Sequence, residues 1–327
     1  MKLVIPMAGL GTRMRPHTWS RPKPLLPLAG RPILDHILQR FHEIPIDEYV
    51  FVIGWLGEQV ETWVKTHSAI PTAFIRQEER LGQAHAIWLA HEHLQGPLFL
   101  TYVDTLFDGA DLSGLDQEGL DGLIFTKEVE DPRRFGVVET DETGRATRLI
   151  EKPDTIDNKT VLIGLYYFRD GEWLSRACRE LMDRDLKTKG EYYLADAITL
   201  MIQQGANFYT RPVAVWQDTG KPETTLETHR YLLEHGGDNS YQAPRPGVVI
   251  NPPVFIHPQA IVERSVIGPY VSIERNAQVR DSILRDVVVD EESTIEEMLL
   301  QRSLIGRWVS LHGEFRTYNV GDSSTVD

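Results

Sequence analysis

The chain has 327 residues, a length that suggests about two domains. Hydrophobic residues make up 41% of it and charged residues 25%, values typical of a protein that buries a hydrophobic core. The formal net charge is −14, and so acidic a surface repels the backbone of nucleic acids, which argues against a polynucleotide partner. A small anionic substrate stays compatible with this charge, because a single pocket can be locally basic.

Cysteine content and hydrophobic runs bear on where the protein works. Cys178 is the single cysteine, so no internal disulfide can form, and we expect a reducing compartment. The apolar run over residues 3–10 is too short for a signal peptide or a membrane helix, and Pro6 and Gly9 interrupt it. No later segment approaches the length of a membrane span. We therefore predict a cytoplasmic protein with no membrane partner.

Strand-like and helix-like segments alternate through the first third of the chain. Short apolar runs are each followed by a segment whose apolar residues recur at helical spacing. The strand candidates are 2–6, 48–53, 72–77 and 97–103, and the helix candidates are 32–43, 56–67 and 82–94. This alternation predicts the α/β class, with a Rossmann-like, mixed but mostly parallel sheet flanked by helices. In such sheets, ligands bind beyond the carboxyl ends of the strands.

The middle of the chain departs from this alternation. Residues 135–153 carry two β-rich arms around an Asp-Glu-Thr-Gly turn, which predicts a hairpin. Further elements follow, with strands expected at 161–169 and 207–217 and helices at 171–185, 191–204 and 222–235. The last of these strands leads directly into Asp218.

A segment over 237–247 is rich in glycine, proline and polar residues and has no periodicity, so we predict a linker there. Beyond it, over 248–327, an aliphatic residue recurs near every sixth position. Such hexapeptide periodicity predicts a left-handed parallel β-helix, whose coils stack apolar side chains on one another. Short strands in an antiparallel sandwich are the alternative. The predicted domains are therefore an α/β domain over 1–236 and a β-helix domain over 248–327.

The turn after the first predicted strand carries the strongest chemical signal. Gly9 and Gly11 let backbone N–H groups approach a phosphate closely. Arg13 follows at once, and Lys23 stands in a proline-stiffened stretch; two cations beside such a turn suit a triphosphate. Two rival phosphate loops do not fit. Met14 stands where the dinucleotide fingerprint needs its third glycine, and the Gly-Lys-Ser/Thr of the Walker motif is absent.

Two aspartates, Asp104 and Asp218, each follow a predicted apolar strand. This places both at the carboxyl edge of the sheet, where ligands bind. Magnesium takes one or two protein carboxylates, while substrate phosphates and water complete its shell. An aspartate after a strand is also a common helix cap, and the Thr-Gly-Lys-Pro sequence after Asp218 keeps that alternative open. The pair beside a phosphate loop favours a magnesium site.

Three histidines, His85, His91 and His93, fall on the helix predicted at 82–94. The spacing of the first two does not place them on one face, as a shared metal ion would require. We therefore expect these histidines to pack in the core or to face solvent.

Six ordered blocks of the first 235 residues match a known pattern. They read MAGLGTRMRPHT with PKPLLPL, RQEERLGQAHAI, DPRRFGVVE, IEKP, LIGLYYF and VWQDTGKPE. In these blocks the chain resembles the sugar-1-phosphate nucleotidyltransferases, also called nucleotide-sugar pyrophosphorylases. The hexapeptide tail is also found in several branches of that family. The resemblance implies that residues 1–236 form a catalytic domain, which transfers a nucleoside monophosphate from a nucleoside triphosphate to a sugar 1-phosphate and releases pyrophosphate.

The resemblance also assigns roles to individual residues. Arg13 and Lys23 are the expected catalytic cations, and Mg²⁺ is the expected cofactor. The other expected residues are Ala8, Gly9, Gly11, Thr12, Gln77 and Gly82 on the nucleotide side, Gly136, Glu151, Lys152 and Gly164 on the sugar-phosphate side, and Asp104 and Asp218 as metal ligands. An exposed ion pair is the alternative for Glu151 and Lys152. Val103 and Thr105 depart from the glycine and asparagine that usually flank the first aspartate.

The nucleotide is expected to be a pyrimidine. Gln77 carries an amide donor and a carbonyl acceptor, so it can pair with both O4 and N3–H of uracil or thymine. The MAGLG loop resembles uridylyltransferases, and LGQAHAI resembles glucose-1-phosphate thymidylyltransferases of the longer type. We therefore expect UTP or dTTP, with glucose 1-phosphate as the second substrate.

Three other functions stay open at this point. A mannose-1-phosphate guanylyltransferase would use GTP instead. A non-catalytic relative that binds nucleotide sugars would be expected to lack one of the key charges, yet Arg13, Lys23 and both aspartates are present. An acyltransferase tail would need an acceptor-activating group, and the tail offers only His257 and His312. Assembly into a homo-oligomer is the role that we expect for the tail.

Overall fold

A computed structural model of the protein describes residues 1–115, 119–242, 245–314, 317 and 319–320. The chain divides into two compact units. The N-terminal unit comprises Met1–Leu26 and Pro32–Lys221, and the C-terminal unit comprises Pro27–Arg31 and Pro222–Asp327. The units therefore change over at Lys221, ahead of the boundary predicted at residue 236.

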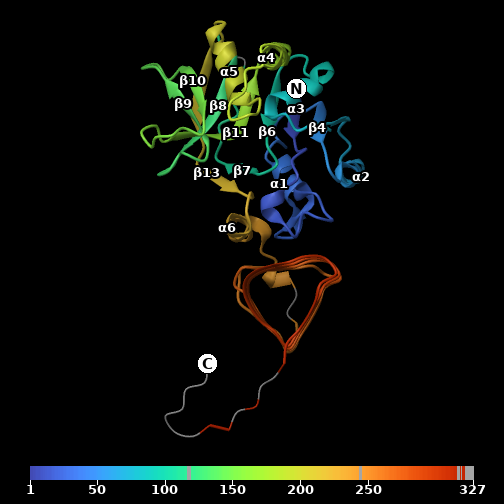
Figure 1. The fold of residues 1–327 in the computed structure, drawn as a ribbon. Coiled ribbons are helices and arrows are strands. Elements are labelled where there is room, and N and C mark those ends of the chain that lie inside the picture. Colours follow the sequence, from blue (N-terminus) through green and yellow to red (C-terminus); the bar gives the residue numbers. More distant parts are fainter. Residues whose placement is uncertain (116–118, 243–244, 315–316, 318, 321–327) are drawn as a thin grey trace. The chain divides into compact units, whose positions relative to one another are not determined.

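The N-terminal unit is built on a nine-stranded mixed sheet (Figure 1). Its strands are β1 (Lys2–Pro6), β4 (Glu48–Ile53), β5 (Thr72–Arg76), β6 (Leu98–Thr101), β8 (Gly122–Glu128), β9 (Gly136–Thr140), β10 (Ala146–Glu151), β11 (Thr160–Phe168) and β12 (Phe208–Pro212). Strands β5, β4, β1 and β6 are parallel neighbours in that order, and β11 joins β6 antiparallel. β9 and β10 form the predicted hairpin beside β11. The predicted α/β class and mixed sheet are confirmed.

Helices complete this unit. They are α1 (Ile33–Gln39), α2 (Gly57–His67), α3 (Gln83–Leu89), α4 (Gly171–Asp183) and α5 (Leu194–Gln203), with short 3-10 turns η1 (Thr12–Met14), η2 (Lys23–Leu25) and η3 (His91–His93). α4 shows why these segments are helical, since Leu174, Cys178 and Leu181 recur at helical spacing and are all buried. Asp170 caps its N-terminus by accepting from two backbone amides. No described helix has the length and apolar composition that crossing a bilayer requires.

The single strand expected at 207–217 is two strands in the structure. β12 pairs with β8 in the large sheet, whereas β13 (Val215–Asp218) pairs antiparallel with β7 (Thr105–Asp108) in a separate two-stranded sheet. The break follows Pro212, a residue that has no N–H to continue a ladder. The apolar pattern runs through both strands, and this is why the sequence did not reveal the change of sheet.

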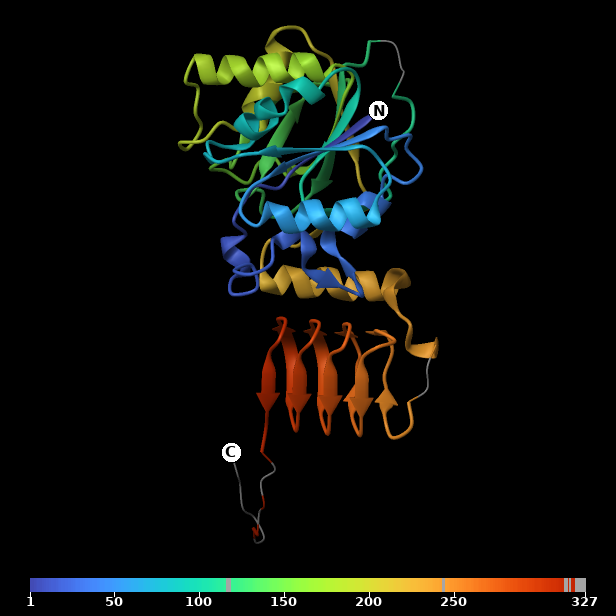
Figure 2. The ribbon, with the colours of Figure 1, turned by 90° about the vertical axis from the view of Figure 1, so that its right-hand side faces the viewer.

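The tail of the C-terminal unit is a parallel β-helix. Its strands are β14 (Val249–Ile250), β15 (Val254–Ile256), β16 (Ile261–Glu263), β17 (Val266–Ile267), β18 (Val271–Ile273), β19 (Gln278–Arg280), β20 (Ile283–Val289), β21 (Thr294–Glu296), β22 (Leu299–Ile305) and β23 (Ser310–His312). All pairings among these described strands are parallel, so that Val254 pairs with Val271, which pairs with Val287 (Figure 2). These three valines are fully buried in one apolar stack. The antiparallel sandwich is thereby excluded, while the left-handed sense stays a prediction.

The second segment of the C-terminal unit begins with a helix, which precedes the predicted linker. The remaining elements of this unit are β2 (Pro27–Leu28), β3 (Arg31–Pro32), α6 (Pro222–Leu232), the π-helical η4 (Leu233–Gly237) and the 3-10 turn η5 (Ser240–Gln242). Arg230 on α6 donates from Nε to the buried Asp286 of β20 at 2.9 Å. The Tyr270 hydroxyl donates to Glu234 at 2.5 Å. These bonds explain why α6 belongs to the same compact unit as the tail.

Candidate active site

A cavity of about 410 Å³ lies at the carboxyl ends of β1, β5 and β6 in the N-terminal unit. From the loop after β1 it is lined by Ala8, Gly9, Gly11, Thr12 and Arg13. Elsewhere its lining includes Lys23, Gln77, Gly82 and Asp104. The structure thus brings together the residues expected on the nucleotide side, the two expected catalytic cations and one expected metal ligand.

The loop after β1 is held in one shape by its own hydrogen bonds. Gly11 has a φ of +60°, in the left-handed region that favours glycine. Its carbonyl accepts from the Thr18 hydroxyl at 2.8 Å and from the Met14 N–H at 2.9 Å. Thr12 and Arg13 come next, and both are exposed where they line the cavity. The loop therefore places Arg13, a positively charged side chain, at the cavity on a turn of defined shape.

The backbone brings Asp104 and Asp218 to neighbouring positions. In the β7–β13 pair, Asp218 lies opposite the residue that follows Asp104, and the Thr219 N–H donates to the Asp104 carbonyl at 3.3 Å. A Cβ on Gly220 would lie 2.8 Å from Asp218 Oδ1 and 3.0 Å from a terminal nitrogen of Arg13. Asp218 Oδ1 also accepts from the Gly220 N–H at 2.8 Å, so it stabilises the turn there. Two carboxylates and a guanidinium therefore converge at this edge.

Lys23 and Asp104 form an ion pair at the cavity. The Lys23 ammonium lies 3.1 Å from Asp104 Oδ2, and the two side chains are 9% and 37% exposed. Burial alone would raise the pKa of Asp104, but the charge and hydrogen bond of Lys23, followed by the charge of Arg13, outweigh it and lower that pKa. Asp104 is therefore ionised at neutral pH.

Gln77 lies at the opposite wall, where it is 8% exposed. Its amide nitrogen lies 3.2 Å from the Gly82 carbonyl oxygen and 3.1 Å from Nδ1 of His85. Both amide hydrogens are thus used within the protein, and only the carbonyl oxygen remains for a base. The two-point pairing expected with O4 and N3–H stays a prediction, and in this structure a contact within the protein takes the donor that O4 would need.

The residues expected on the sugar-phosphate side gather on the β9–β10 hairpin and β11, next to the cavity lining rather than in it. Glu151 pairs with Gly136 across the hairpin, and a Cβ on Gly136 would lie 3.1 Å from the Glu151 carboxylate. Burial raises the pKa of Glu151, and the charge of Lys152 opposes this only in part. Lys152 Nζ donates to the Tyr193 hydroxyl at 2.9 Å, and this bond raises the pKa of Lys152.

Tyr102 connects the two groups of residues. It lines the cavity close to Asp104, and a Cβ on Gly164 would lie 2.8 Å from its ring. Burial raises the pKa of Tyr102, and further increases come from neighbours that include Glu151 and Asp104. Its hydroxyl is buried, and no described residue forms a hydrogen bond with it. Sequence reasoning missed Tyr102, since a tyrosine in an apolar stretch is typical of any buried strand end.

Three more polar side chains of the lining were missed, namely Arg80, Gln83 and Glu191. Arg80 and Gln83 lie on either side of Gly82 in the RQEERLGQAHAI block, so their position in that block could have predicted that they line the site. Glu191 precedes α5 and is brought to the cavity by a chain segment whose sequence has no phosphate-loop or strand-end pattern.

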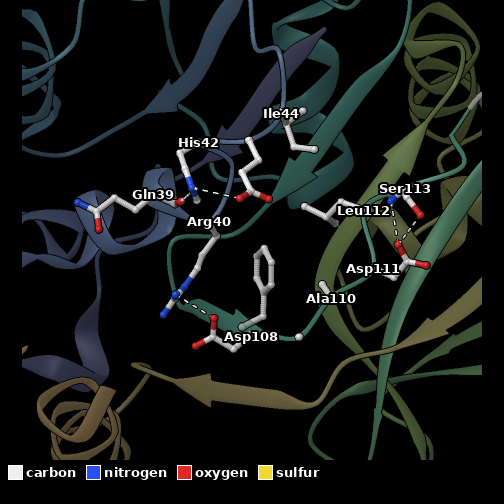
Figure 3. A pocket seen from close by; sticks show the side chains of 12 residues that line it. Gln39, Arg40, His42, Ile44, Asp108, Ala110, Asp111, Leu112 and Ser113 are labelled. Carbon is white, nitrogen blue, oxygen red and sulfur yellow. Dashed lines mark hydrogen bonds and ion pairs between the residues drawn. The ribbon is translucent and has the colours of Figure 1, made fainter. Parts of the chain in front are cut away.

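A second cavity, of about 500 Å³, lies at the far end of β7. Figure 3 shows Arg40 and Asp108 pointing toward one another across it, as an ion pair of 2.8 Å. On the other side, Asp111 accepts from the Ser113 N–H at 3.0 Å and from its hydroxyl at 2.6 Å. None of the predicted site residues lines this cavity. Strand β7 connects the two cavities. It begins directly after Asp104, which lines the first cavity, and ends at Asp108, which lines the second.

Comparisons with known proteins identify the fold and the family of this chain. The structure resembles a crystal structure of UDP-glucose pyrophosphorylase complexed with UDP-glucose, with a TM-score of 0.60 and 21% sequence identity. The match covers 72% of this chain and 98% of that chain. At this identity the likeness shows the fold alone. The sequence profile of the nucleotidyl transferase family matches residues 2–235, and the chain belongs to that family.

Relatives with curated names agree with this membership. The chain is 33% identical over 243 residues to the low-salt glycan biosynthesis nucleotidyltransferase Agl11 of Haloferax volcanii, a match that covers 72% of this chain and 66% of that protein. It is 28% identical to a glucose-1-phosphate thymidylyltransferase of Streptomyces antibioticus, over 100% of this chain and 99% of the relative. The chain spans 56% to 66% of the length of Agl11 and two further curated relatives that it matches.

Proposed function

We propose that the protein is a sugar-1-phosphate nucleotidyltransferase that transfers UMP or dTMP from UTP or dTTP to glucose 1-phosphate and releases pyrophosphate. The observation that carries this proposal is the convergence of Lys23 and Arg13 with Asp104 and Asp218 beside a glycine-containing loop. Family membership supports nucleotidyl transfer. A thymidylyltransferase among the relatives and a UDP-glucose pyrophosphorylase among the similar structures support the pyrimidine and the glucose.

The nucleotide would occupy the cavity at the loop after β1. The backbone at Ala8, Gly9, Gly11 and Thr12 would hold the base, the ribose and the phosphates. The base would lie over Gly82, and the Gln77 carbonyl would accept a hydrogen bond from N3–H of uracil or thymine. Arg13 and Lys23 would bind the triphosphate.

The sugar phosphate would bind between the cavity and the β9–β10 hairpin. The buried Glu151 would accept a hydrogen bond from a sugar hydroxyl, and Lys152 would supply a cation for the phosphate. Gly136 and Gly164 would let Glu151 and Tyr102 lie close to the backbone on the sugar side, because a Cβ at either position would meet those side chains. Tyr102, with its unpartnered buried hydroxyl, would reach the same space.

Asp104 and Asp218 fit a divalent cation. Their backbones are neighbours, and carboxylate oxygens are the protein ligands that Mg²⁺ prefers. When bound there, Mg²⁺ would neutralise charge on the phosphates of the reacting nucleotide. Lys23 would be the second positive group at this place, beside the cation. Its ammonium lies 3.1 Å from Asp104 Oδ2, so it could contact both that carboxylate and the triphosphate.

The residues of this site would align two anions rather than remove a proton. An oxygen of the sugar phosphate forms a bond to the α-phosphorus, and the bond from that phosphorus to the pyrophosphate oxygen breaks. The attacking oxygen is already anionic, so no general base is needed. Arg13 and Lys23 would offset the negative charge that develops on the leaving pyrophosphate, while Lys152 holds the attacking group in line.

Assembly and location follow as proposals from the same features. We expect a homo-oligomer formed through the β-helix, whose last described strands, β22 and β23, each pair with a single described strand. Light scattering would give a mass above the 37.3 kDa of a single chain. We expect the protein to work in the cytoplasm, which agrees with its single buried cysteine.

A substrate panel tests the proposal. Each of UTP, dTTP, CTP, GTP and ATP would be combined with glucose, mannose or N-acetylglucosamine 1-phosphate, and pyrophosphate release would be measured with Mg²⁺. We expect turnover with UTP or dTTP and glucose 1-phosphate. Preference for GTP and mannose 1-phosphate would instead identify a guanylyltransferase. Binding without pyrophosphate release for every pair would identify a non-catalytic relative.

A further inference from the structure

The amide of Gln77 has an orientation that the surrounding protein determines. Its Nε2 lies 3.2 Å from the Gly82 carbonyl oxygen and 3.1 Å from Nδ1 of His85. A carbonyl oxygen only accepts hydrogen bonds, so the Gln77 atom that faces it must be the NH₂ group. Nδ1 of His85 must then accept the second amide hydrogen. The proton of the neutral His85 ring is therefore on Nε2.

The Gly82 carbonyl is itself held in place. Gly82 has a φ of +117°, and a Cβ there would lie 2.5 Å from the Tyr192 carbonyl oxygen, so only glycine fits. Tyr192 clamps the segment on both sides of Gly82, because its N–H donates to Leu81 and its carbonyl accepts from Ala84, each at 2.9 Å. One of the two partners of the Gln77 amide is thus fixed by backbone alone. The second partner is His85.

His85 is held in the neutral form that this arrangement needs. It is 9% exposed, and burial lowers its pKa, against the opposing effects of a hydrogen bond to the Glu79 backbone and of the Glu79 charge. Trp88 stacks beside the ring with centroids 6.5 Å apart, and the Arg179 guanidinium of α4 lies on Trp88. A neutral ring without a proton on Nδ1 accepts from Gln77 at neutral pH.

We propose that His85 is a positioning residue for the choice of nucleotide: by accepting from the Gln77 amide, it turns the Gln77 carbonyl toward the cavity, where it selects a base with an imino N–H. This inference rests on the proposed nucleotidyl transfer. Gln77 lines the cavity, and no described residue donates to its carbonyl oxygen. Uracil and thymine present N3–H to such an acceptor, whereas N3 of cytosine is itself an acceptor.

A histidine that only packs would have a different consequence. Replacing it by an apolar side chain of similar size would leave the relative preference for UTP and CTP unchanged. If His85 orients Gln77, the same replacement leaves the Gly82 carbonyl as the one remaining partner of the NH₂ group. The flipped amide, which offers its NH₂ to cytosine, then becomes less unfavourable. The ratio of the two nucleotides therefore separates a positioning role from a structural one, even when both substrates are used less well.

The decisive variants are His85→Leu and His85→Asn, with His91→Leu as the matched control. Leucine removes the acceptor, whereas the Oδ1 of asparagine can accept in place of Nδ1. His91 is an exposed histidine beyond α3 whose Nδ1 lies 3.1 Å from the Trp88 carbonyl oxygen. We expect His85→Leu to lower the UTP-to-CTP ratio of kcat/KM about tenfold, the equivalent of one hydrogen bond. His85→Asn should keep the ratio within about threefold, and His91→Leu should not change it.

Two measurements test the role of His85 without relying on enzymatic turnover. The ¹⁵N spectrum of the wild-type protein should show His85 with a protonated Nε2 and a bare Nδ1, a signal assigned by its loss in His85→Asn. Calorimetry with UDP and CDP should give the same loss of base preference in His85→Leu as the kinetics. If no nucleotide supports pyrophosphate release, the proposed function is wrong, and the binding ratio and the tautomer still test His85. A protonated Nδ1, or an unchanged UDP-to-CDP ratio in a folded His85→Leu protein, would overturn the inference.

Discussion

Lys23→Met removes one positive charge from the proposed site and keeps most of the side chain's volume. In the wild type, the ammonium lies 3.1 Å from Asp104 and the Lys23 side chain is only 9% exposed, so little water is present to take its place. The variant therefore leaves the Asp104 carboxylate, and any bound triphosphate, without this charge. We expect the chemical step to suffer more than the binding of the sugar phosphate, which has Lys152 as its own cation.

The expected losses of kcat and of folding stability in Lys23→Met follow from how exposed Lys23 and Asp104 are. Removing a preorganised group that stabilises charge in the transition state costs about 10²- to 10³-fold in kcat, or about 3–4 kcal/mol. The effect on folding should be small by comparison. Asp104 is 37% exposed and remains partly hydrated, so the lost ion pair is worth at most about 1 kcal/mol. Lys23→Met should thus be a folded protein with a strongly reduced kcat.

Steady-state pyrophosphate release, with each substrate varied in turn, separates these effects. Lys127→Met is a matched control, since Lys127 donates to the Ala214 carbonyl at 2.7 Å but does not line the cavity. We expect the control to stay near wild type, and Lys23→Met to keep its KM for the sugar phosphate within about threefold. A variant with normal kcat and a weakened sugar-phosphate KM would refute the placement of Lys23 on the triphosphate.

Three further predictions concern the neighbouring residues. Asp104→Asn and Asp218→Asn should each lower kcat by about 10²-fold or more at saturating Mg²⁺ without unfolding the protein, and near-normal turnover of either would remove it from the metal site. Because burial raises the folded-state pKa of Glu151, its contribution to stability is present at low pH and is lost as the pH rises through that pKa. In thermal melts, Glu151→Gln should thus stabilise the protein more at about pH 8 than at about pH 5, unlike the exposed Glu139→Gln. Gly82→Ala should destabilise folding by about 1–3 kcal/mol and raise the KM for UTP, because alanine is strained at a φ of +117°; an unchanged melting temperature would contradict this.

Local periodicity was enough to predict most of the N-terminal unit. Strands such as β4 and helices such as α4 alternate because buried sheets and amphipathic helices impose different spacings on apolar residues. The loop after β1 and the two aspartates could be placed at strand ends for the same reason, since each follows a recognisable strand. The parallel strands of the tail were predictable because aliphatic residues recur there at short, regular intervals.

Long-range partners were the part that the sequence did not reveal. Nothing in residues 208–218 shows that the first half pairs with β8 and the second half with β7, because pairing depends on residues far along the chain. The same holds for α6, whose helical pattern does not show that Arg230 bonds with Asp286. His85 was expected to pack or to face solvent, and its contact with Gln77 emerged only once the chain was folded.

The balance of charge in the cavity explains how an acidic protein can be suited to a polyanion. The whole chain carries a formal charge of −14, yet Lys23 and Arg13 lie beside the two aspartates at the proposed site. The lowered pKa of Asp104 shows that the neighbouring cations, Lys23 and then Arg13, prevail over its burial. The aspartates are neighbours because the main chain of β7 pairs with β13, rather than because their side chains attract. Backbone pairing thus brings two aspartates together at the edge where we propose that a divalent cation binds, and Lys23 and Arg13 would offset the charge of a triphosphate there.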